Sequence, residues 1–324
     1  MAFSRIAHVA HSLPKKIVTN HDLAGILDTS DEWIYSRTGI KERRVAQDET
    51  AVTLAQDVAE QLVMKSGCQV DEIDFVIVAS ISQDATMPSL AAKVQSAIGA
   101  NKAFAFDISA ACSGFVFALA TADKLIASGA YQKGIVIGSE TMSRTLDWQD
   151  RSTAVLFGDG AGGVLLEASE TRYFLAENLY TDGRRGDSLQ LPKAFSATPF
   201  SDKERISSYL TMEGRAVFDF VVKEVPKSIQ ETLADVGLSA AKVDYYLLHQ
   251  ANYRLLDKIS KKIGVDIEKL PANIARYGNT SAASIPILLS ECLADGRLML
   301  GSGQVVLFSG FGGGLTWGNI LVKL

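Results

Sequence analysis

The sequence predicts an α/β protein built from two duplicated halves. Short, continuously apolar strands alternate with amphipathic helices, and similar strands recur about 170 residues apart. A glycine that ends a helix precedes two of these strands, at Gly67 and Gly237. Apolar strands between helices are typical of a buried, largely parallel sheet. We place the two halves at residues 1–169 and 170–324.

The expected elements follow from the apolar pattern along the chain. Buried strands are expected at residues 75–79, 103–108, 134–138, 153–157, 164–167, 245–248 and 305–308. An apolar helix is expected after residue 112, and a second helix at residues 252–263. In the second helix one stripe is apolar, formed by Leu255, Leu256, Ile259 and Ile263.

The repeat can be assigned a register. Residues 73–78 match residues 243–248 at an offset of 170, and residues 135–139 match residues 305–309 at the same offset. Residues 109–111 match residues 281–283 at an offset of 172. Each match alone is weak, because short apolar strands resemble one another, but together they indicate an internal duplication. The polar, Gly/Pro-punctuated stretch from Asp182 to about Glu204 is expected to be a surface excursion of the second half.

The composition excludes several classes of protein. Apolar residues make up 47% and charged residues 21% of the 324 residues, which excludes a disordered or fibrous chain. A net charge of −5 argues against a general nucleic-acid binder, so any anion site has to be a local patch. We expect no secretory signal and no membrane span. Three widely spaced cysteines predict neither a disulfide framework nor a clustered metal site, and they indicate a reducing, cytoplasmic compartment.

Cys112 is the candidate nucleophile. It lies at a predicted turn between a strand and a helix, where backbone N–H groups and the positive end of the helix dipole favour thiolate over thiol. Small neighbours on both sides let a substrate carbonyl approach. The alternative, a buried structural cysteine, stays open on this segment alone. Cys68 and Cys292 have no comparable setting, and we interpret both as structural.

Two other polar residues are candidates for chemistry. The chain has four histidines, and His249, the one that follows residue 21, comes directly after an expected strand. The carboxyl end of a parallel strand is where α/β sites usually form. Asn279 follows a glycine turn and precedes small residues that open a helix, and its amide can donate to an oxyanion without titrating. A histidine satisfied in the core and an ordinary cap asparagine are the alternatives.

Two glycine-rich segments need separate interpretation. Residues 158–163 satisfy G-x-G-x-x-G but lead into a strand, whereas a dinucleotide site requires a helix there, so we interpret them as a tight turn. Residues 309–318 also join two strands, and bare backbone N–H groups there can form half of an oxyanion hole. Close strand packing without chemistry is the alternative.

Taken together, these segments resemble the β-ketoacyl-[acyl-carrier-protein] synthase III family, which starts type II fatty-acid synthesis. The resemblance spans nearly the whole chain in the right order, over residues 31–34, 37–40, 110–115, 150–153, 157–162, 249–252, 278–284 and 310–318. It implies a homodimer with a thiolase-like fold, in which the two duplicated halves form five α-β-α-β-α layers. Related elongating synthases carry a second histidine, and degradative thiolases a second cysteine in the C-terminal glycine loop; this chain has neither.

The resemblance implies a decarboxylative Claisen condensation. Acetyl-CoA or a short branched acyl-CoA would acylate Cys112, with the backbone N–H groups of Cys112 and Gly313 as the oxyanion hole. Malonyl-[acyl-carrier-protein] would then lose CO₂, and His249 and Asn279 would donate to the resulting enolate oxygen. The product would be 3-oxoacyl-[acyl-carrier-protein]. Acyl-CoA is a substrate here, and no metal, redox cofactor, nucleic acid or membrane is expected.

The resemblance also implies three groups of binding residues. Trp33 would stack on the adenine of CoA, with Arg37 and Arg151 near the nucleotide, and Thr29 and Glu32 form a capping box for the short helix that carries Trp33 and Arg37. A basic face for the acidic carrier protein would consist of Arg254, Lys258, Lys261 and Lys262. Lysines near a helix C-terminus also offset its dipole, which is the alternative role for this face.

The acyl pocket would contain Phe157, Phe311 and Met87, the last reaching the pocket of the partner subunit. Many relatives have a bulky aromatic residue at the position of Met87. A narrow, flexible methionine predicts that somewhat longer or branched short acyl-CoAs are accepted as well as acetyl-CoA.

Two other functions remain open from the sequence. One is a cysteine acyl-thioester hydrolase or another acyltransferase of the same superfamily, which would use the same three residues. The other is a scaffold that only binds acyl-CoA, in which Cys112, His249 and Asn279 would be replaceable. Carbon–carbon bond formation with release of CO₂ distinguishes the condensing enzyme from both.

Overall fold

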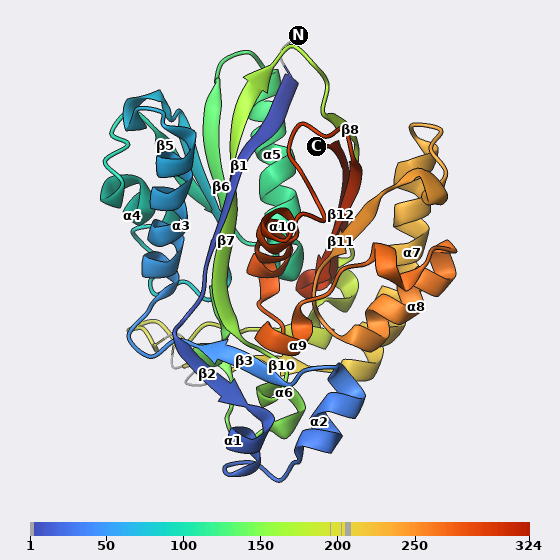
Figure 1. The fold of residues 1–324 in the computed structure, drawn as a ribbon. Helices are drawn as coiled ribbons and strands as arrows, with labels where there is room; N and C mark the ends of the chain where they lie inside the picture. Colours follow the sequence, from blue (N-terminus) through green and yellow to red (C-terminus); the bar gives the residue numbers. More distant parts are fainter. Residues whose placement is uncertain (1–2, 195, 202, 205–208) are drawn as a thin grey trace.

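Two β-sheets form the body of the molecule (Figure 1). The computed structural model describes residues 3–194, 196–201, 203–204 and 209–324. The first sheet has the strand order β1-β7-β6-β4-β5, and the second has the order β11-β12-β13-β8. The strands of the first sheet are β1 (Phe3–Ser12), β4 (Phe75–Ala79), β5 (Phe104–Ile108), β6 (Lys133–Thr141) and β7 (Asp159–Ser169). Those of the second are β8 (Phe174–Thr181), β11 (Tyr245–Leu248), β12 (Val305–Gly312) and β13 (Thr316–Lys323).

Helices cover both sheets and separate them. The helices between the sheets are α5 (Gly114–Ala127) and α10 (Ser284–Ala294), and they share one apolar core with residues of both sheets. The outer helices are α3 (Ala51–Ser66) and α4 (Leu90–Ala97) beside the first sheet, and α7 (Gly214–Ala234) and α8 (Tyr253–Ile263) beside the second. The predicted order of five layers, α-β-α-β-α, is therefore confirmed, and each sheet is buried on both faces.

The sheets are mixed rather than largely parallel, which corrects the prediction. β4 pairs in parallel with β5 and β6, and β11 pairs in parallel with β12. The remaining strands run antiparallel to their neighbours. In the second half β12 and β13 are joined by one short turn, η8 (Gly313–Leu315), and such a hairpin needs no crossover helix.

The structure changes the register of the repeat. Phe75 in β4 lies opposite Gly134 in β6, and Tyr245 in β11 lies opposite Val306 in β12. When β4 is aligned with β11 at an offset of 170, β6 is therefore aligned with β12 at an offset of 172. The turns η2 (Ala111–Ser113) and η7 (Ser281–Ala283) correspond at an offset of 170. The two predicted offsets are thus interchanged, because continuous apolar runs match in more than one register. The division at residues 169 and 170 remains a prediction.

Two short helices differ from the expectation. α2 (Asp31–Thr38) is capped by Ser30, whose hydroxyl accepts from the backbone N–H of Trp33, so the predicted capping box with Thr29 is wrong. Residues 153–157 were expected as a strand, but α6 (Arg151–Ala154) occupies the start of this range because Asp150 caps the helix by accepting from the Ser152 N–H.

Further short elements of the chain are α1 (Asn20–Ala24), α9 (Ile274–Tyr277), β2 (Lys16–Thr19) and β3 (Glu42–Val45).

The glycines of residues 158–163 do not form a tight turn. All but Gly158 lie within β7, and a Cβ added at Gly162 would come within 2.7 Å of the Ile287 backbone nitrogen in α10. These glycines therefore let the central helix pack closely on the strand.

The expected surface excursion after Asp182 does more than cover the surface. Its described residues form η4 (Gly183–Ser188) and β9 (Leu189–Gln190), which pairs with β10 (Thr211–Met212); residues 195 and 202 lie outside the described chain. β9 and β10 cover the cavity described below. Among the described residues, no helix has the length and apolar character needed to cross a membrane.

Candidate active site

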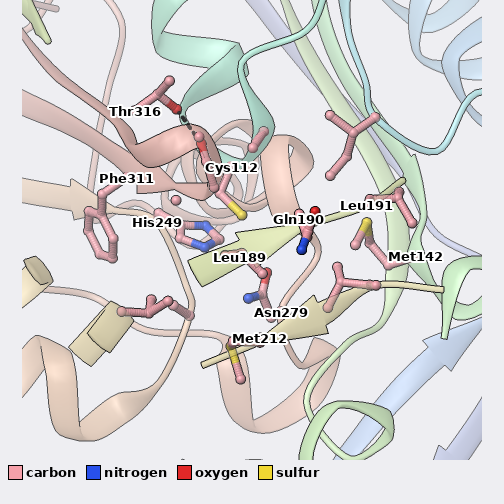
Figure 2. A pocket seen from close by; sticks show the side chains of 18 of the residues that line it. Cys112, Met142, Leu189, Gln190, Leu191, Met212, His249, Asn279, Phe311 and Thr316 are labelled. Carbon is pink, nitrogen blue, oxygen red and sulfur yellow. Dashed lines mark hydrogen bonds between the residues drawn. The ribbon is translucent and has the colours of Figure 1, made fainter. Parts of the chain in front are cut away.

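One cavity of about 600 Å³ brings the three candidate residues together (Figure 2). Cys112 comes from η2, between β5 and α5; His249 follows β11; and Asn279 lies between α9 and η7. Figure 2 shows the three side chains around one space, with the Cys112 sulfur directed into it. Most of the lining is apolar, so a polar group that reacts there is largely shielded from water.

Backbone geometry places Cys112 in the cavity. Ala111 has a left-handed φ of 46°, which bends the chain sharply between β5 and α5. The hairpin turn of β12 and β13 packs directly on this bend: a Cβ at Gly312 would lie 2.7 Å from Cys112 Cβ and 3.0 Å from its sulfur. The Thr316 hydroxyl lies 2.7 Å from that of Ser113 and 3.0 Å from the carbonyl oxygen of Ala110, which fixes the two turns together.

Burial dominates the ionisation of Cys112. It raises the thiol pKa to about 12, while the Ser281 hydroxyl and the backbone N–H groups of Cys112 and Gly313 lower the pKa. The sequence therefore predicts correctly that N–H groups act on the sulfur, but it misses the larger opposing effect of burial. The resting side chain is a thiol, and a reaction at sulfur has to remove its proton.

His249 is held neutral and fixed in orientation. Burial lowers its pKa to about 3. Its Nδ1 lies 2.7 Å from the Ser284 hydroxyl at the start of α10, and its ring meets the Phe311 ring edge-on with centroids 5.3 Å apart. A neutral imidazole has one N–H donor and one acceptor nitrogen.

Asn279 has its amide orientation fixed by one hydrogen bond. Its Oδ1 accepts from the backbone N–H of Ser281 at 2.8 Å, which leaves the Nδ2 donors for the cavity. The backbone of Asn279 is tied to the first half, since its N–H donates to the Leu156 carbonyl at 2.8 Å and its carbonyl accepts from the Gly158 N–H at 3.0 Å.

The three residues predicted to bind CoA lie together outside this cavity. The guanidinium carbons of Arg37 and Arg151 lie 4.5 Å and 5.1 Å from the centroid of the Trp33 ring. Both arginines are exposed, and Arg151 also donates to the Asp28 carbonyl at 2.6 Å. Helix α2 contacts the cavity lining through Asn252, whose Nδ2 donates to the Arg37 carbonyl at 3.0 Å.

The predicted stripes of α8 are present. Its apolar residues are buried against the second sheet, and its four cationic residues, Arg254, Lys258, Lys261 and Lys262, are exposed. Lys261 pairs with Asp257 at 2.7 Å, so its charge is partly compensated within the helix. Leu255, from the buried stripe, lines the cavity.

The predicted acyl-pocket residues are divided between two places. Phe157 and Phe311 line the cavity. Met87 does not line it; it lies on the surface with 85% of its area exposed, in the loop between β4 and α4.

The comparisons with known proteins agree with this architecture. A family model for 3-oxoacyl-[acyl-carrier-protein] synthase III matches residues 106–183. A second family model, for the C-terminal part of the same enzyme, matches residues 233–324. A β-ketoacyl-[acyl-carrier-protein] synthase III of Streptococcus sanguinis is 60% identical over all of both chains. The crystal structure of 3-oxoacyl-[acyl-carrier-protein] synthase III from Aquifex aeolicus is 40% identical, with a TM-score of 0.92 over 99% of this chain and 100% of that one. That from Pseudomonas aeruginosa is 36% identical, with a TM-score of 0.91 over 99% and 98%.

This chain belongs to the β-ketoacyl-[acyl-carrier-protein] synthase III family. It is thus an acyltransferase of fatty-acid synthesis. The thiolase-like fold inferred from the sequence is confirmed by the structures of the synthase III family.

Several residues in and around this site could not be assigned a role from the sequence. Ser281 and Ser284 lie within a segment that it singled out, but they have no role there without the contacts to Cys112 and His249. Glu140 could not be identified, because a polar residue next to the end of an apolar strand is equally compatible with a surface position. The cavity residues of the excursion and its neighbours, Leu189, Gln190, Leu191, Leu210 and Met212, follow no periodic pattern that could have marked them.

Proposed function

We propose that the cavity performs a decarboxylative Claisen condensation of a short acyl-CoA with malonyl-[acyl-carrier-protein]. The observation that carries this proposal is the meeting of one buried thiol, one neutral imidazole and one oriented amide in a single apolar cavity. A thiol supplies a covalent carrier for the acyl group, and two neutral donors stabilise a developing oxyanion without titrating. The reaction that forms the 3-oxoacyl-[acyl-carrier-protein] product requires no metal or redox cofactor.

In the first stage Cys112 attacks the thioester carbonyl of acyl-CoA. The carbonyl oxygen becomes an oxyanion, to which the backbone N–H groups of Cys112 and Gly313 donate hydrogen bonds. Both groups already lower the pKa of the sulfur, so they face the place where charge develops. Gly312 allows this approach, because a side chain there would overlap Cys112.

In the second stage His249 and Asn279 stabilise the enolate left when malonyl loses CO₂. His249 Nδ1 lies 2.7 Å from the Ser284 hydroxyl, and in the tautomer that this stage requires Nδ1 accepts a hydrogen bond from that hydroxyl while the ring proton on Nε2 is a donor. Asn279 supplies a second donor from Nδ2. The enolate carbon then attacks the acyl group on Cys112 and releases the sulfur.

The two carriers are assigned to two surfaces. The Trp33 ring with Arg37 and Arg151 offers a stacking face and two cations, which suits the adenine and phosphates of CoA. The exposed cations of α8 lie on the turns that follow Asn252, which lines the cavity, and they suit an acidic carrier protein.

We place the enzyme in the cytoplasm as a homodimer. β5 is the edge strand of the first sheet, and within the described residues no strand pairs with its outer side, which can therefore pair with a second copy. In such a dimer the exposed Met87 would enter the acyl pocket of the partner beside its phenylalanines. The slender methionine leaves room for branched primers as well as acetyl groups.

Intact-protein mass spectrometry tests the proposal in two steps. Acetyl-CoA should add one acetyl group to the wild-type protein and none to Cys112→Ala, and malonyl-[acyl-carrier-protein] should then discharge it as a 3-oxobutanoyl carrier. If acetyl-CoA gives no adduct but a larger acyl-CoA does, the mechanism stands and only the identity of the primer changes. If no acyl-CoA labels Cys112, the proposed function is wrong.

A further inference from the structure

A buried carboxyl group lies behind the nucleophile. Glu140 is the penultimate residue of β6 and is fully buried. Its Oε2 accepts from the backbone N–H groups of Ile81 and Ser82, both at 3.1 Å, and from the Ser80 and Ser82 hydroxyls. Its Oε1 has no hydrogen-bond partner among the described residues. The donors therefore hold one oxygen of a carboxylate and leave the other free to accept.

Ser281 lies on the turn that packs between this carboxyl group and Cys112. Its turn, η7, packs against both β6 and η2, and a Cβ at Gly138 would lie 2.3 Å from the Ala282 carbonyl oxygen. Ser281 has a left-handed φ of 49°, which is strained for a residue with a side chain. Its hydroxyl lowers the pKa of both the Cys112 thiol and the Glu140 carboxyl, so it lies beside each group. Within the described chain, neither this buried Oγ nor Glu140 Oε1 has a hydrogen-bond partner, so two unpaired polar atoms lie behind the thiol.

The reaction needs a proton acceptor that the residues lining the cavity do not provide. Their titratable groups in the described structure are Cys112, His249 and Lys193. His249 is a weak base, since its pKa falls to about 3, and its donor is needed for the second stage. Lysine is ordinarily protonated and has no lone pair to accept with. Glu140 is the charged group that acts on Cys112, and burial raises the pKa of its carboxyl, which strengthens it as a base.

We propose that Glu140, acting through the Ser281 hydroxyl, takes up the Cys112 proton during acylation and returns it after condensation. The Cys112 proton moves to Ser281 Oγ as the Ser281 proton moves to Glu140 Oε1. The sulfur forms its bond to the acyl carbon, the bond from that carbon to the CoA sulfur breaks, and the CoA thiolate takes a proton from water. After condensation Cys112 leaves as a thiolate and recovers the stored proton. Glu140 touches no substrate and is a positioning residue; the inference rests on the proposed function.

Glu140→Gln separates this role from a purely electrostatic one, because the two predict opposite signs. The negative charge of Glu140 raises the pKa of Cys112, so its removal should shift the pH profile of alkylation by iodoacetamide to lower pH. If Glu140 acts only through its charge, acetylation by acetyl-CoA should become faster as well. If Glu140 accepts the proton, acetylation should slow by about 100-fold at neutral pH although the thiol ionises more easily. An acetylation rate equal to or above that of the wild type overturns the inference.

Further variants keep the test decisive if Glu140→Gln folds poorly. Ser281→Ala should slow acetylation by a similar factor. The variant with both Glu140→Gln and Ser281→Ala should be little slower than either single variant, since both changes interrupt the same proton path.

Asp159→Asn is the matched control. Asp159 is a buried carboxyl on β7, it opposes Thr141 next to Glu140, and it accepts hydrogen bonds from Ala46 and Ser143. Its acetylation rate per folded molecule should not change. Failure of the wild type to acetylate contradicts the proposed function, whereas fast acetylation in Ser281→Ala contradicts this inference alone.

Discussion

At Cys112 two opposing effects act on one sulfur. Burial raises the pKa of the thiol, and N–H groups of the turn lower it, with burial the larger effect. The same N–H groups donate hydrogen bonds to the oxyanion in the proposed first stage. The turn is therefore better suited to the charge of the reacting carbonyl than to that of a resting thiolate, as expected for binding of a transition state.

Asn279→Asp should separate the two stages. The Asp side chain keeps an oxygen for the Ser281 N–H and replaces the donor amide with a second carboxylate oxygen, which repels an enolate. We expect condensation to fall by at least about 100-fold, with acetylation of Cys112 nearly unchanged. Product formation and intact-protein mass measure the two rates on the same sample. Equal loss of both would show that Asn279 does not serve the enolate alone.

His249 should make the protein less stable in acid. Its folded-state pKa is lowered from 6.5 to about 3, so between these values the unfolded chain binds a proton that the folded chain does not. The free energy of unfolding therefore falls as the pH drops through this window, by about 2 kcal/mol between about pH 7 and about pH 5 from this one group. Urea unfolding at the two pH values should show this loss in the wild type and much less of it in His249→Gln. His21→Gln changes an exposed histidine and should retain the full loss.

Among the elements, the apolar strands and long helices could be predicted from sequence. β4 and β11 begin and end at the expected residues, and α8 ends at the expected residue and begins one residue after the expected start, with Asn252 as its cap. Local competition between polar groups could not be predicted. Thr29 and Ser30 can both cap α2, and only the three-dimensional chain shows that Ser30 accepts the Trp33 N–H. In the same way, Asp150 caps α6, so a helix begins where the apolar pattern favours a strand.

Helix α8 gives a prediction about the carrier protein. Arg254→Glu with Lys258→Glu reverses two exposed charges of α8 without changing the buried stripe of that helix. We expect kcat/KM for malonyl-[acyl-carrier-protein] to fall about tenfold at low salt and by less at high salt, while acetylation by acetyl-CoA is unchanged. The control reverses Lys223 and Lys227, exposed residues of the neighbouring α7. A similar loss in the control would indicate a general charge effect instead of a docking face.

At the scale of the whole molecule, the five layers explain why the candidate residues meet. Both sheets bury apolar strands against α5 and α10, and the segments after β5 and β11 emerge on the same side of this core. The duplication and the layers were predictable because they depend on repeated apolar patterns. The cover formed by β9 and β10 was not, since each strand has two residues and their pairing joins segments about 20 residues apart.

Met87→Phe tests the proposed dimer and the primer preference together. In its own chain Met87 fills no pocket, because it is 85% exposed. If it enters the site of a partner, a phenylalanine there should narrow the pocket and reduce the rate with isobutyryl-CoA relative to acetyl-CoA by about tenfold. Sedimentation should give about twice the mass of one chain. A monomer, or an unchanged preference in the variant, would contradict the placement of Met87.

The two left-handed bends have an evolutionary consequence. Ala111 and Ser281 occupy equivalent turns, each leading into a central helix, so the residue equivalent to Cys112 is Ala282. The second half therefore keeps the outline of a nucleophile turn without its nucleophile. A doubled ancestral gene in which each copy specialised would leave this trace: one bend retained the reactive sulfur, and the other came to present the hydroxyl that serves it.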